Sequence, residues 1–413
     1  MNDSAPLPPV LIVGVDSPIG LTLIRELGRR GVPVHGLARS RRGVGLHSRY
    51  LAAGFIHPRR DAAMIEAIRR HADAHGIALL MAISEPDLLF LQERAEELPG
   101  MRLLLPPPDA LHQVLDKAQT LELAQRLGLS IPPTRHPRSA EEAPEIAREL
   151  PFPVVLKWAD PQRAAPILAA HGIPLLKAEI LATPEALAAA LRRFQPAGLF
   201  PMVQGWVPGV GVGQSFYLWR GETRLFFQHR RLHEWPPEGG YSTLCESLPG
   251  DAFPELRRQS EALLRALGWE GAAMVEYRLD PATGRAALME INGRFWGSLP
   301  LASHCGAAFG WMTYCCQGLE RPPPEPASPP RAGVRCRFAF PELRRLVALF
   351  SRRRRADPLF EAHPWRDLAT FLGQSLDPAL THYVWDREDA VPFWRDLEYA
   401  LRSRLPGWRE EGS

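Results

Sequence analysis

The sequence predicts an α/β fold, and two observations carry this prediction. In residues 10–106, short apolar runs typical of buried strands alternate with segments of helical periodicity. Such alternation predicts a parallel sheet with helices on both faces. Further along the chain, strand-like segments follow one another through short polar turns, which is typical of antiparallel hairpins.

The first region covers residues 1–106 and contains the stretch "VLIVGVDSPIGLTLIREL". We expect strands at 10–13, 32–38, 78–84 and 102–106, and helices at 21–29, 62–75 and 86–97. The turn after the first strand has Asp16 where the dinucleotide-binding fingerprint requires its second glycine. A carboxylate there would block and repel a pyrophosphate, so the segment is interpreted as a structural turn, which argues against an NAD-dependent protein.

The middle region runs from residue 107 to residue 320. Asp109 and Thr183 each suit the N-cap of a helix, and residues 251–268 form an amphipathic helical segment. We expect strands around Lys157 and at 201–207, 214–221 and 223–232. Residues 271–292 read as a hairpin whose loop is Asp280–Gly284.

The last region follows a proline-rich break, "ERPPPEPASPPRAG", which we interpret as a linker or surface strap at 321–330. Residues 331–413 contain helical segments, including an amphipathic one at 392–405, and several aromatic residues that favour packing onto the core. The basic run "SRRRR" at 351–355 is interpreted as a solvated helix end in preference to a contact with a polyanion or a membrane.

Composition narrows the class of protein. The 413 residues carry a formal net charge of +3, which does not call for a nucleic-acid partner, and no apolar run is long enough to span a membrane. The start of the chain lacks the pattern of a secretory signal. The five cysteines include no CxxC pair, so we expect reduced thiols in a cytoplasmic protein and no zinc site.

A metal site is predicted by the stretch "ALMEINGRFWGS", residues 287–298. Glu290 and Asn292 share one face of an apolar strand, and Glu276 lies on the preceding strand of the hairpin. Two carboxylates and an amide form a hard-oxygen site that suits Mg²⁺. Arg294, two residues further on, has the fork geometry that binds phosphate or acyl phosphate. Polar residues facing water are the alternative, against which the flanking apolar residues argue.

A metal–phosphate site also needs cations, and two lysines are candidates. Lys157 interrupts the apolar strand "PVVLKW", where an ammonium group requires a partner. Lys117, taken alone, could equally be a solvated helix residue. The P-loop pattern is absent from the sequence.

These motifs, taken in order, resemble the ATP-grasp superfamily. They are "DKAQT", "PFPVVLKW", "MVQGWVPG", "MVEYRL" and "MEINGRFWG", and the resemblance covers roughly residues 10–320. Within this superfamily, the sequence is similar in particular to carboxylate–amine ligase-like proteins and, more distantly, to carbamoyl-phosphate synthetases. The resemblance implies a Rossmann-like preceding domain (1–106), a two-lobed ATP-grasp domain (107–320) with its lid at roughly 152–203, and a mostly helical C-terminal extension (331–413).

The resemblance also implies roles for single residues. Lys117 and Lys157 would contact ATP phosphates, and Arg294 would stabilise the transferring phosphoryl group. The hinge segment that contacts adenine would consist of Gln204, Gly205, Trp206 and Val207, and the ligands of Mg²⁺ or Mn²⁺ would be Glu276, Glu290 and Asn292. "EGGYST", residues 238–243, takes the place of a loop over the phosphates. His229, Arg230 and Arg231 either point into the cleft or form a solvated strand face.

The function implied by the resemblance is ATP-dependent ligation of a small-molecule carboxylate and an amine through an acyl phosphate. Alternatives are an enzyme that phosphorylates a carboxylate or carbamate, and a non-catalytic nucleotide-binding regulatory protein. The sequence departs from the family in the lid, where a glycine-rich loop is missing and Lys177 stands instead, and in the hinge, where the ribose-binding acid is replaced by glycines. Members of the superfamily are often dimers, so the resemblance also implies a homodimer.

Overall fold

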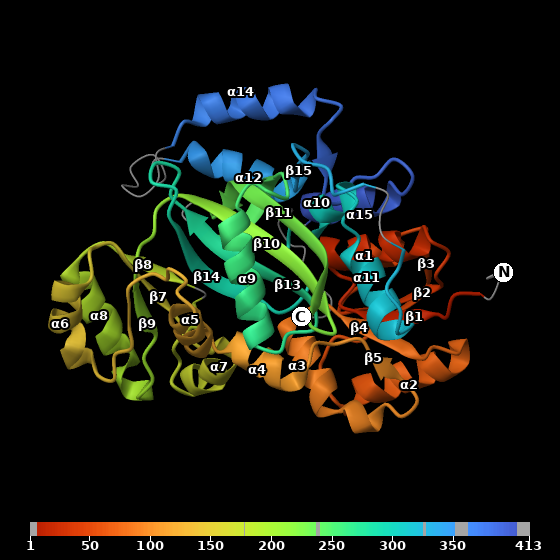
Figure 1. Ribbon diagram of the computed structural model, residues 1–413, viewed down its shortest axis with the longest axis horizontal. Coiled ribbons are helices and arrows are strands. Elements are labelled where there is room, and N and C mark those ends of the chain that lie inside the picture. The colour runs from red at the N-terminus through yellow and green to blue at the C-terminus, as the bar shows by residue number, and fades with distance from the viewer. Residues whose placement is uncertain (1–5, 177, 237–239, 325–327, 352–361, 403–413) are drawn as a thin grey trace.

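Three sheets organise the protein in a computed structural model, which describes residues 6–176, 178–236, 240–324, 328–351 and 362–402. Figure 1 shows a five-stranded sheet at one end of the molecule, a four-stranded sheet at the other, and a seven-stranded sheet between them. The mixed α/β class expected from the sequence is confirmed.

The five-stranded sheet is parallel throughout and has the order β3-β2-β1-β4-β5. Its strands are β1 (Val10–Val13), β2 (Val34–Ala38), β3 (Leu51–Ile56), β4 (Leu79–Ala82) and β5 (Arg102–Leu103), and its helices are α1 (Pro18–Gly28), α2 (Ala62–His75) and α3 (Glu85–Glu93). Sequence analysis missed β3. This strand lies at the sheet edge, and its small residues do not form the apolar run that identifies a buried strand.

Asp16 has the structural role expected of it. Its carboxylate accepts hydrogen bonds from the backbone N–H groups of Arg39 and Ser40, at 2.8–2.9 Å and 3.1 Å, and so ties the first turn to the end of β2. Burial raises the pKa of Asp16, although these hydrogen bonds act in the opposite direction. The carboxylate therefore accepts the hydrogen bonds of these backbone N–H groups at the turn that a dinucleotide would approach.

The four-stranded sheet has the order β6-β9-β7-β8 and its own apolar core. Its strands are β6 (Thr134–Arg135), β7 (Val154–Lys157), β8 (Glu179–Leu181) and β9 (Met202–Gly205), and the nearby helices are α6 (Ala143–Glu149), α7 (Pro161–Ala170) and α8 (Pro184–Phe194). Thr183 caps α8 as predicted, accepting from the N–H of Ala186. The prediction for Asp109 was wrong: α4 (Pro108–Leu115) has Pro107 at its N-cap, and Asp109 lies in the first turn.

The seven-stranded sheet has the order β14-β13-β10-β11-β12-β15-β16. Its strands are β10 (Val210–Trp219), β11 (Glu222–Trp235), β12 (Tyr241–Ser247), β13 (Gly271–Leu279), β14 (Ala286–Asn292), β15 (Arg335–Arg337) and β16 (Thr381–His382). Helices α9 (Pro254–Ala266) and α11 (Phe309–Thr313) both contact β10, and α10 (Leu299–His304) contacts β12. The hairpin expected at residues 271–292 is confirmed as β13 and β14.

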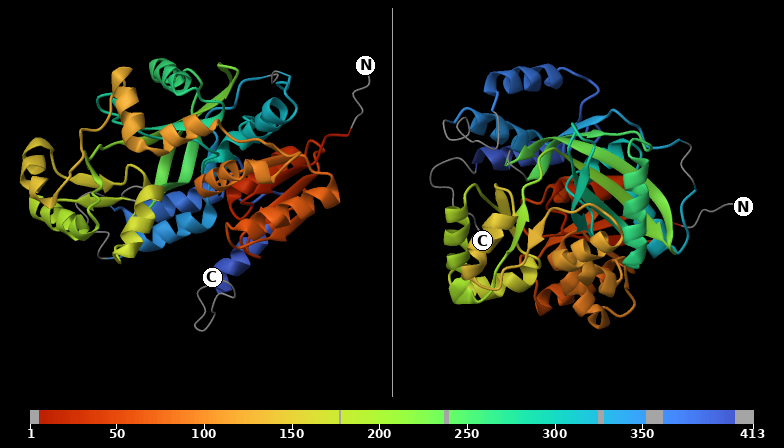
Figure 2. Two further views of the ribbon diagram at one scale, coloured as in Figure 1. Left: turned by 90° about the horizontal axis from the view of Figure 1, so that it is seen from below. Right: turned by 60° about the vertical axis from the view of Figure 1, so that its left-hand side comes forward.

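The residues after 331 combine helices with two strands of the central sheet. Helices α12 (Ala339–Leu349) and α14 (Pro364–Ser375) lie together at the top of Figure 1, and α12 contacts β11 and β12. Helix α15 (Val391–Arg402) returns to the first sheet, where it packs beside Val44–His47 (Figure 2). The buried pair of Arg25 and Asp389, 3.0 Å apart, fixes the segment that precedes α15 against α1.

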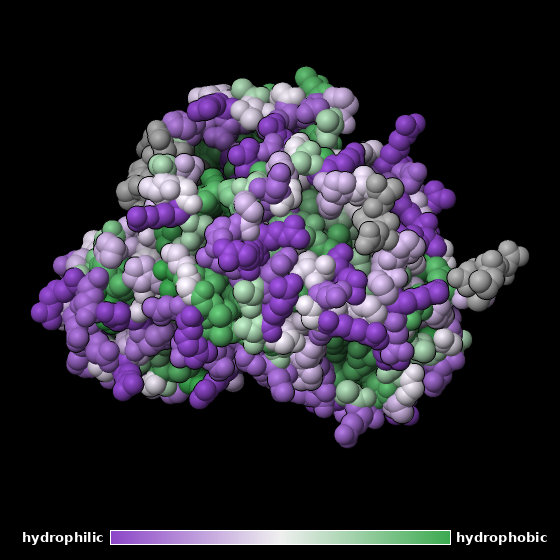
Figure 3. All heavy atoms as spheres, viewed as in Figure 1, coloured by the Kyte–Doolittle hydropathy of each residue, from purple (hydrophilic) through white to green (hydrophobic). Residues whose placement is uncertain are grey.

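Some sequence-based predictions concern residues outside those that the structure describes: Lys177, the first two residues of "EGGYST", the arginines of the basic run and the last residues of the predicted terminal helix. The five cysteines are all buried and unbridged. Among the described residues, no helix combines the length and apolarity needed to cross a bilayer. The face in Figure 3 is largely hydrophilic, with hydrophobic side chains gathered in small separate areas.

Candidate functional site

A cavity of about 400 Å³ lies between the four-stranded sheet and the seven-stranded sheet. Its size is in the range of small-molecule and cofactor sites. Strands β7, β8 and β9 provide one wall, β11, β13 and β14 provide the other, and the first residue of α5 (Lys117–Arg126) joins them. Eight of the ten residues predicted for the site line this cavity: Lys117, Lys157, Gln204, Gly205, Trp206, Val207, Glu276 and Glu290.

The two predicted metal-binding carboxylates face each other across paired strands. Glu276 on β13 is directly opposite Glu290 on β14. The register shifts immediately beyond this pair, so that Met289 is an extra residue on β14, and it lines the cavity together with Glu290. A bulge of this kind re-aims side chains at the edge of a sheet. Both glutamates therefore project into one space, as the hairpin prediction required.

Each carboxylate is paired with a cation. Lys117 Nζ lies 3.2 Å from Glu290 Oε2. Arg231 donates hydrogen bonds to Glu276 and, at 3.1 Å, to Glu234. Burial alone would lower the pKa of Arg231, but the charges of Glu276 and Glu234 outweigh it and raise the pKa. Arg231 therefore stays charged inside the cavity.

The position of Lys117 is fixed by backbone contacts, whereas Lys157 is the last residue of β7. The N–H of Lys117 donates to the carbonyl of Ala159 at 2.9 Å, which ties the start of α5 to the segment after β7. The side chain of Asp116 caps this helix through Ala118 and Gln119. Burial lowers the pKa of Lys157, with Glu290 and Glu276 acting in the opposite direction. An ammonium group in this position favours an anionic ligand.

The predicted hinge segment lies on the opposite wall. The N–H groups of Gly205 and Trp206 donate to the carbonyls of Pro133 and Pro153, at 2.8 Å and 3.1 Å. The buried amide of Gln204 donates from Nε2 to Thr134 at 3.0 Å. These bonds fix the segment rigidly against β6 and β7, with Trp206 at the cavity.

Two predicted residues are not among those that line the cavity. Asn292 lies two residues beyond Glu290 on the same strand and is buried. Arg294 donates to Glu85 of α3 at 3.0 Å and to the carbonyl of Phe295 at 3.0 Å. It lines a second, water-sized cavity of about 20 Å³ between the first sheet and the central sheet.

The triplet on β11 divides between the two faces of its strand. Arg231 lines the cavity, whereas Arg230 points the other way and pairs with Glu246. His229 is buried, and its Nε2 lies 2.8 Å from the hydroxyl of Ser298. Burial, followed by the charge of Arg231, lowers the pKa of His229 to about 3, so this ring is neutral. The sequence had left both alternatives open.

Sequence reasoning missed Arg278, which also lines the cavity, whereas Tyr241, another lining residue, belongs to the segment "EGGYST" that the sequence had placed over the phosphates. Of the described side chains that line it, four are cationic (Lys117, Lys157, Arg231 and Arg278) and two are acidic. One feature of the sequence could have strengthened the prediction of this site: of the 49 lysine and arginine residues, only three are lysines, namely Lys117, Lys157 and Lys177. A chain that otherwise uses arginine keeps two of its three lysines in this cavity.

Comparisons with known proteins find similarity in sequence and in structure. The sequence model of the family described as "Carbamoyl-phosphate synthase L chain, ATP binding domain" matches residues 245–308. The carbamoyl phosphate synthase large chain of Thermus thermophilus is 26% identical over 239 residues, which are 55% of this chain and 21% of that protein. The chain thus spans about a fifth of the length of this relative.

Solved structures extend the likeness over most of the chain. The biotin carboxylase domain of the Hydrogenobacter thermophilus 2-oxoglutarate carboxylase, in complex with MgADP, ADP and bicarbonate, aligns with a TM-score of 0.61. It is 14% identical, and the alignment covers 80% of this chain and 73% of that one. The protein has the ATP-grasp fold. The L-amino acid ligase of Bacillus licheniformis, with a TM-score of 0.56 and 17% identity, shares this ATP-grasp fold over 76% of this chain and 75% of its own.

Proposed function

We propose that the protein is an ATP-dependent ligase that joins a small-molecule carboxylate to an amine through an acyl phosphate, releasing ADP and phosphate. The observation that carries the proposal is the convergence of Lys117, Lys157 and Arg231 with the carboxylates of Glu276 and Glu290 in one cavity. The excess of cationic side chains suits a polyphosphate. The absence of a protein nucleophile from this set agrees with a reaction in which ATP itself activates the carboxylate.

The implied cofactor is Mg²⁺, and the donor set fits it. Glu276 and Glu290 offer two opposed carboxylates, the hard-oxygen ligands that Mg²⁺ takes together with phosphate oxygens and water. Asn292 is the proposed third ligand, next along the same face of β14. When bound, Mg²⁺ would neutralise charge on the phosphate oxygens.

The protein's own groups position and stabilise the reactants. Lys117 and Lys157 bind the phosphates, and Arg231 holds the carboxylate of Glu276 in position. Preorganised charges of this kind lower the barrier without reorganising during the reaction. The hinge segment binds the adenine; since the N–H groups of Gly205 and Trp206 are engaged, its contacts use backbone carbonyls or the N–H of Val207.

Arg294 is proposed to stabilise the transferring phosphoryl group and the acyl phosphate. Its guanidinium now pairs with Glu85, at the junction of the first and central sheets. The carboxylate substrate would enter from this side, and the release of Arg294 from Glu85 would accompany its binding. Arg294 would therefore contribute only after its release from Glu85, whereas the two lysines already face the cavity.

The proposal divides the chain into a Rossmann-like preceding domain at 1–106, an ATP-grasp domain at 107–320 with its lid at roughly 152–203, a linker at 321–330 and an extension at 331–413. We also propose a homodimer, supported by the description of the Hydrogenobacter domain as a dimer, and a cytoplasmic location, supported by five unbridged cysteines.

The test is ADP and phosphate release from Mg-ATP by the purified full chain in the presence of pooled amino acids and small carboxylates, with mass spectrometry of the products. A condensed product supports the ligase. A phosphorylated product without condensation would replace it with a carboxylate- or carbamate-phosphorylating enzyme, and failure to bind ATP in a direct titration would overturn both.

Two variants complete this test. Glu290→Ala should lose turnover by at least about a hundredfold. Glu246→Gln is the matched control, because Glu246 is also an ion-paired carboxylate of the central sheet but lies outside the cavity. Equal losses in the two variants would contradict the assignment.

A further inference from the structure

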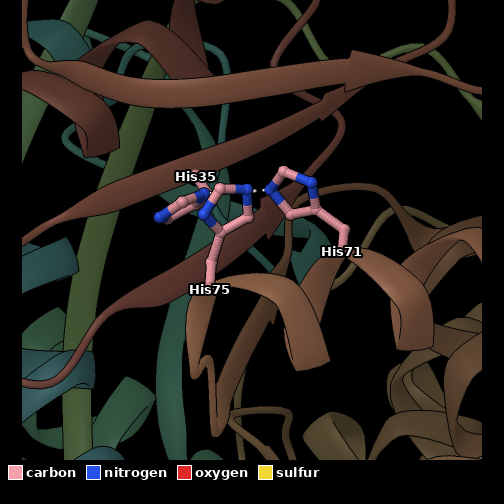
Figure 4. Close-up of side chains that lie close together, drawn as sticks. All are labelled: His35, His71 and His75. Carbon is pink, nitrogen blue, oxygen red and sulfur yellow. Dashed lines mark hydrogen bonds between the residues drawn. The ribbon is translucent and has the colours of Figure 1, made fainter.

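Three histidines converge on the first sheet, away from the cavity described above. His35 comes from β2, and His71 and His75 come from α2 (Figure 4). One ring nitrogen of each lies within 4.8 Å of those of the other two, and His35 Nδ1 is 2.9 Å from His71 Nε2. None of the three residues lines the candidate nucleotide cavity.

Local structure holds the three rings together. His71 and His75 are four residues apart at the C-terminal end of α2, so they share one face of the helix. Gly76, with a φ of +64°, ends the helix immediately after His75. The C-terminal end of a helix carries partial negative charge, which favours a cation beside it.

The spacing of the nitrogens suits a metal ion. Zinc binds imidazole nitrogen at about 2.0–2.1 Å in tetrahedral geometry, which places neighbouring ligand atoms about 3.3 Å apart. His35 Nδ1 and His71 Nε2 are 2.9 Å apart and the ligand atoms of all three rings lie within 4.8 Å of one another, so small movements of the rings would reach this value. Small rotations of the exposed His75 ring would complete the geometry while His35 stays fixed in the core.

Ring packing alone is the competing explanation. The ring centroids are 4.5–5.0 Å apart, and the ring of Phe55 lies 4.6 Å from that of His71. Packing and the 2.9 Å hydrogen bond between His35 and His71 account for two of the rings, but neither requires a nitrogen of His75 to approach them, and here nitrogens of all three rings point toward one another (Figure 4). Burial is graded from buried His35 through His71 to exposed His75, which leaves a route from solvent to the cluster.

We propose that His35, His71 and His75 form a binding site for a Zn²⁺ ion, with water in the fourth position. Imidazole donors select zinc and other late transition metals over Mg²⁺, so the site is chemically distinct from the carboxylates of the cavity. The ion would link β2 to the end of α2 and stabilise the first sheet. The prediction that the chain has no zinc site considered cysteines only, and these histidines come from segments 36 residues apart.

The test is titration of the chelator-treated full chain with ZnCl₂, followed by calorimetry and thermal unfolding. We expect one high-affinity ion per chain and a rise in Tm of a few degrees at a hundredfold excess over Kd. Co²⁺ in place of Zn²⁺ should give the visible absorption of a four-coordinate site with nitrogen ligands.

His75→Ala is the decisive variant, because its side chain is exposed and its loss does not open the core. It should weaken Zn²⁺ binding by at least about a hundredfold and abolish the rise in Tm. The matched control is His171→Ala, since His171 is an exposed histidine at the C-terminal end of α7. The proposal would be overturned if His75→Ala bound Zn²⁺ with unchanged affinity, or if Glu290→Ala, and not His75→Ala, lost the ion.

Discussion

Arg231 reaches Glu276 by crossing a strand that lies between them. Arg231 is on β11 and Glu276 on β13, and β10 pairs with both. The crossing is possible because Gly211 of β10 has no side chain: a Cβ atom there would lie 2.8 Å from Cδ of Arg231. Gly213, two residues on, makes the same kind of room for the ring of His229. Gly211, one of the glycines that follow the hinge segment, therefore makes room for a side chain of the opposite wall of the cavity.

Gly211→Ala should displace Arg231 from Glu276. The added methyl group meets a buried side chain in the middle of a sheet, so we expect a loss of about 1–3 kcal/mol in stability and at least about a tenfold loss in ATP affinity. Thermal unfolding and calorimetric titration with Mg-ATP measure the two effects. Gly250→Ala is the control, because a Cβ there meets no atom within 4 Å. An ATP affinity equal to that of the control would show that Arg231 does not organise the site.

Lys157→Met should separate binding from folding. Replacing a half-buried, partly desolvated ammonium group with an apolar side chain of similar length removes a desolvation cost, so the Tm should stay the same or rise. ATP affinity should fall by at least about tenfold, since a phosphate ligand loses its cation. Thermal unfolding and a Mg-ATP titration of the same sample measure the Tm and the ATP affinity. A lowered Tm with normal ATP affinity would assign Lys157 a structural role.

The hairpin of the site could be predicted from the sequence, whereas the path of Arg231 could not. A turn signal at Asp280–Gly284 between two alternating strands fixes the pairing of Leu279 with Ala286, and the bulge at Met289, which the sequence did not indicate, then brings Glu290 opposite Glu276. The direction of Arg231 depends on which face of β11 meets the cavity and on a glycine of another strand, neither of which is encoded locally. Arg294 shows the same limit, because its partner Glu85 lies 209 residues away.

The first sheet illustrates the difference between buried and edge strands. The continuous apolar runs of β1 and β4 identified them, as expected for central parallel strands. The edge strand β3 alternates between half-buried and exposed residues, and its small side chains gave no signal. Helix α2 was predicted with its bounds, yet the meeting of its histidines with His35 followed only from the packing of α2 on β2.

Arg294→Gln and Glu85→Gln should affect the reaction differently. Each substitution breaks the same partly exposed ion pair, so each should cost at most about 1 kcal/mol of stability. If Arg294 stabilises the transferring phosphoryl group, Arg294→Gln lowers kcat by at least about a hundredfold, whereas Glu85→Gln leaves kcat within a few-fold. Steady-state kinetics of both variants provide the comparison. Similar kcat values would restrict Arg294 to tying α3 to the end of β14.

Glu26→Gln should change how stability depends on pH. Glu26 lies buried on α1, where its Oε2 accepts hydrogen bonds from the N–H groups of Gly310 and Trp311 at 2.8 Å and 3.3 Å. Burial raises the pKa of this carboxyl from 4.5 to about 7. The folded protein therefore holds a proton that the unfolded chain releases above pH 4.5, and this contribution to stability is lost as the pH rises through 7.

Glutamine mimics the protonated carboxyl at every pH. The variant should match the wild-type protein near pH 4.5, become the more stable of the two as the pH rises, and keep a roughly constant advantage above pH 7. A difference of 2.5 pKa units corresponds to an advantage of about 3 kcal/mol. Urea unfolding of both proteins at pH 5, 7 and 8.5 measures it. A difference that does not vary with pH would mean that Glu26 is ionised in the folded protein and that its two backbone donors offset the cost of burying the charge.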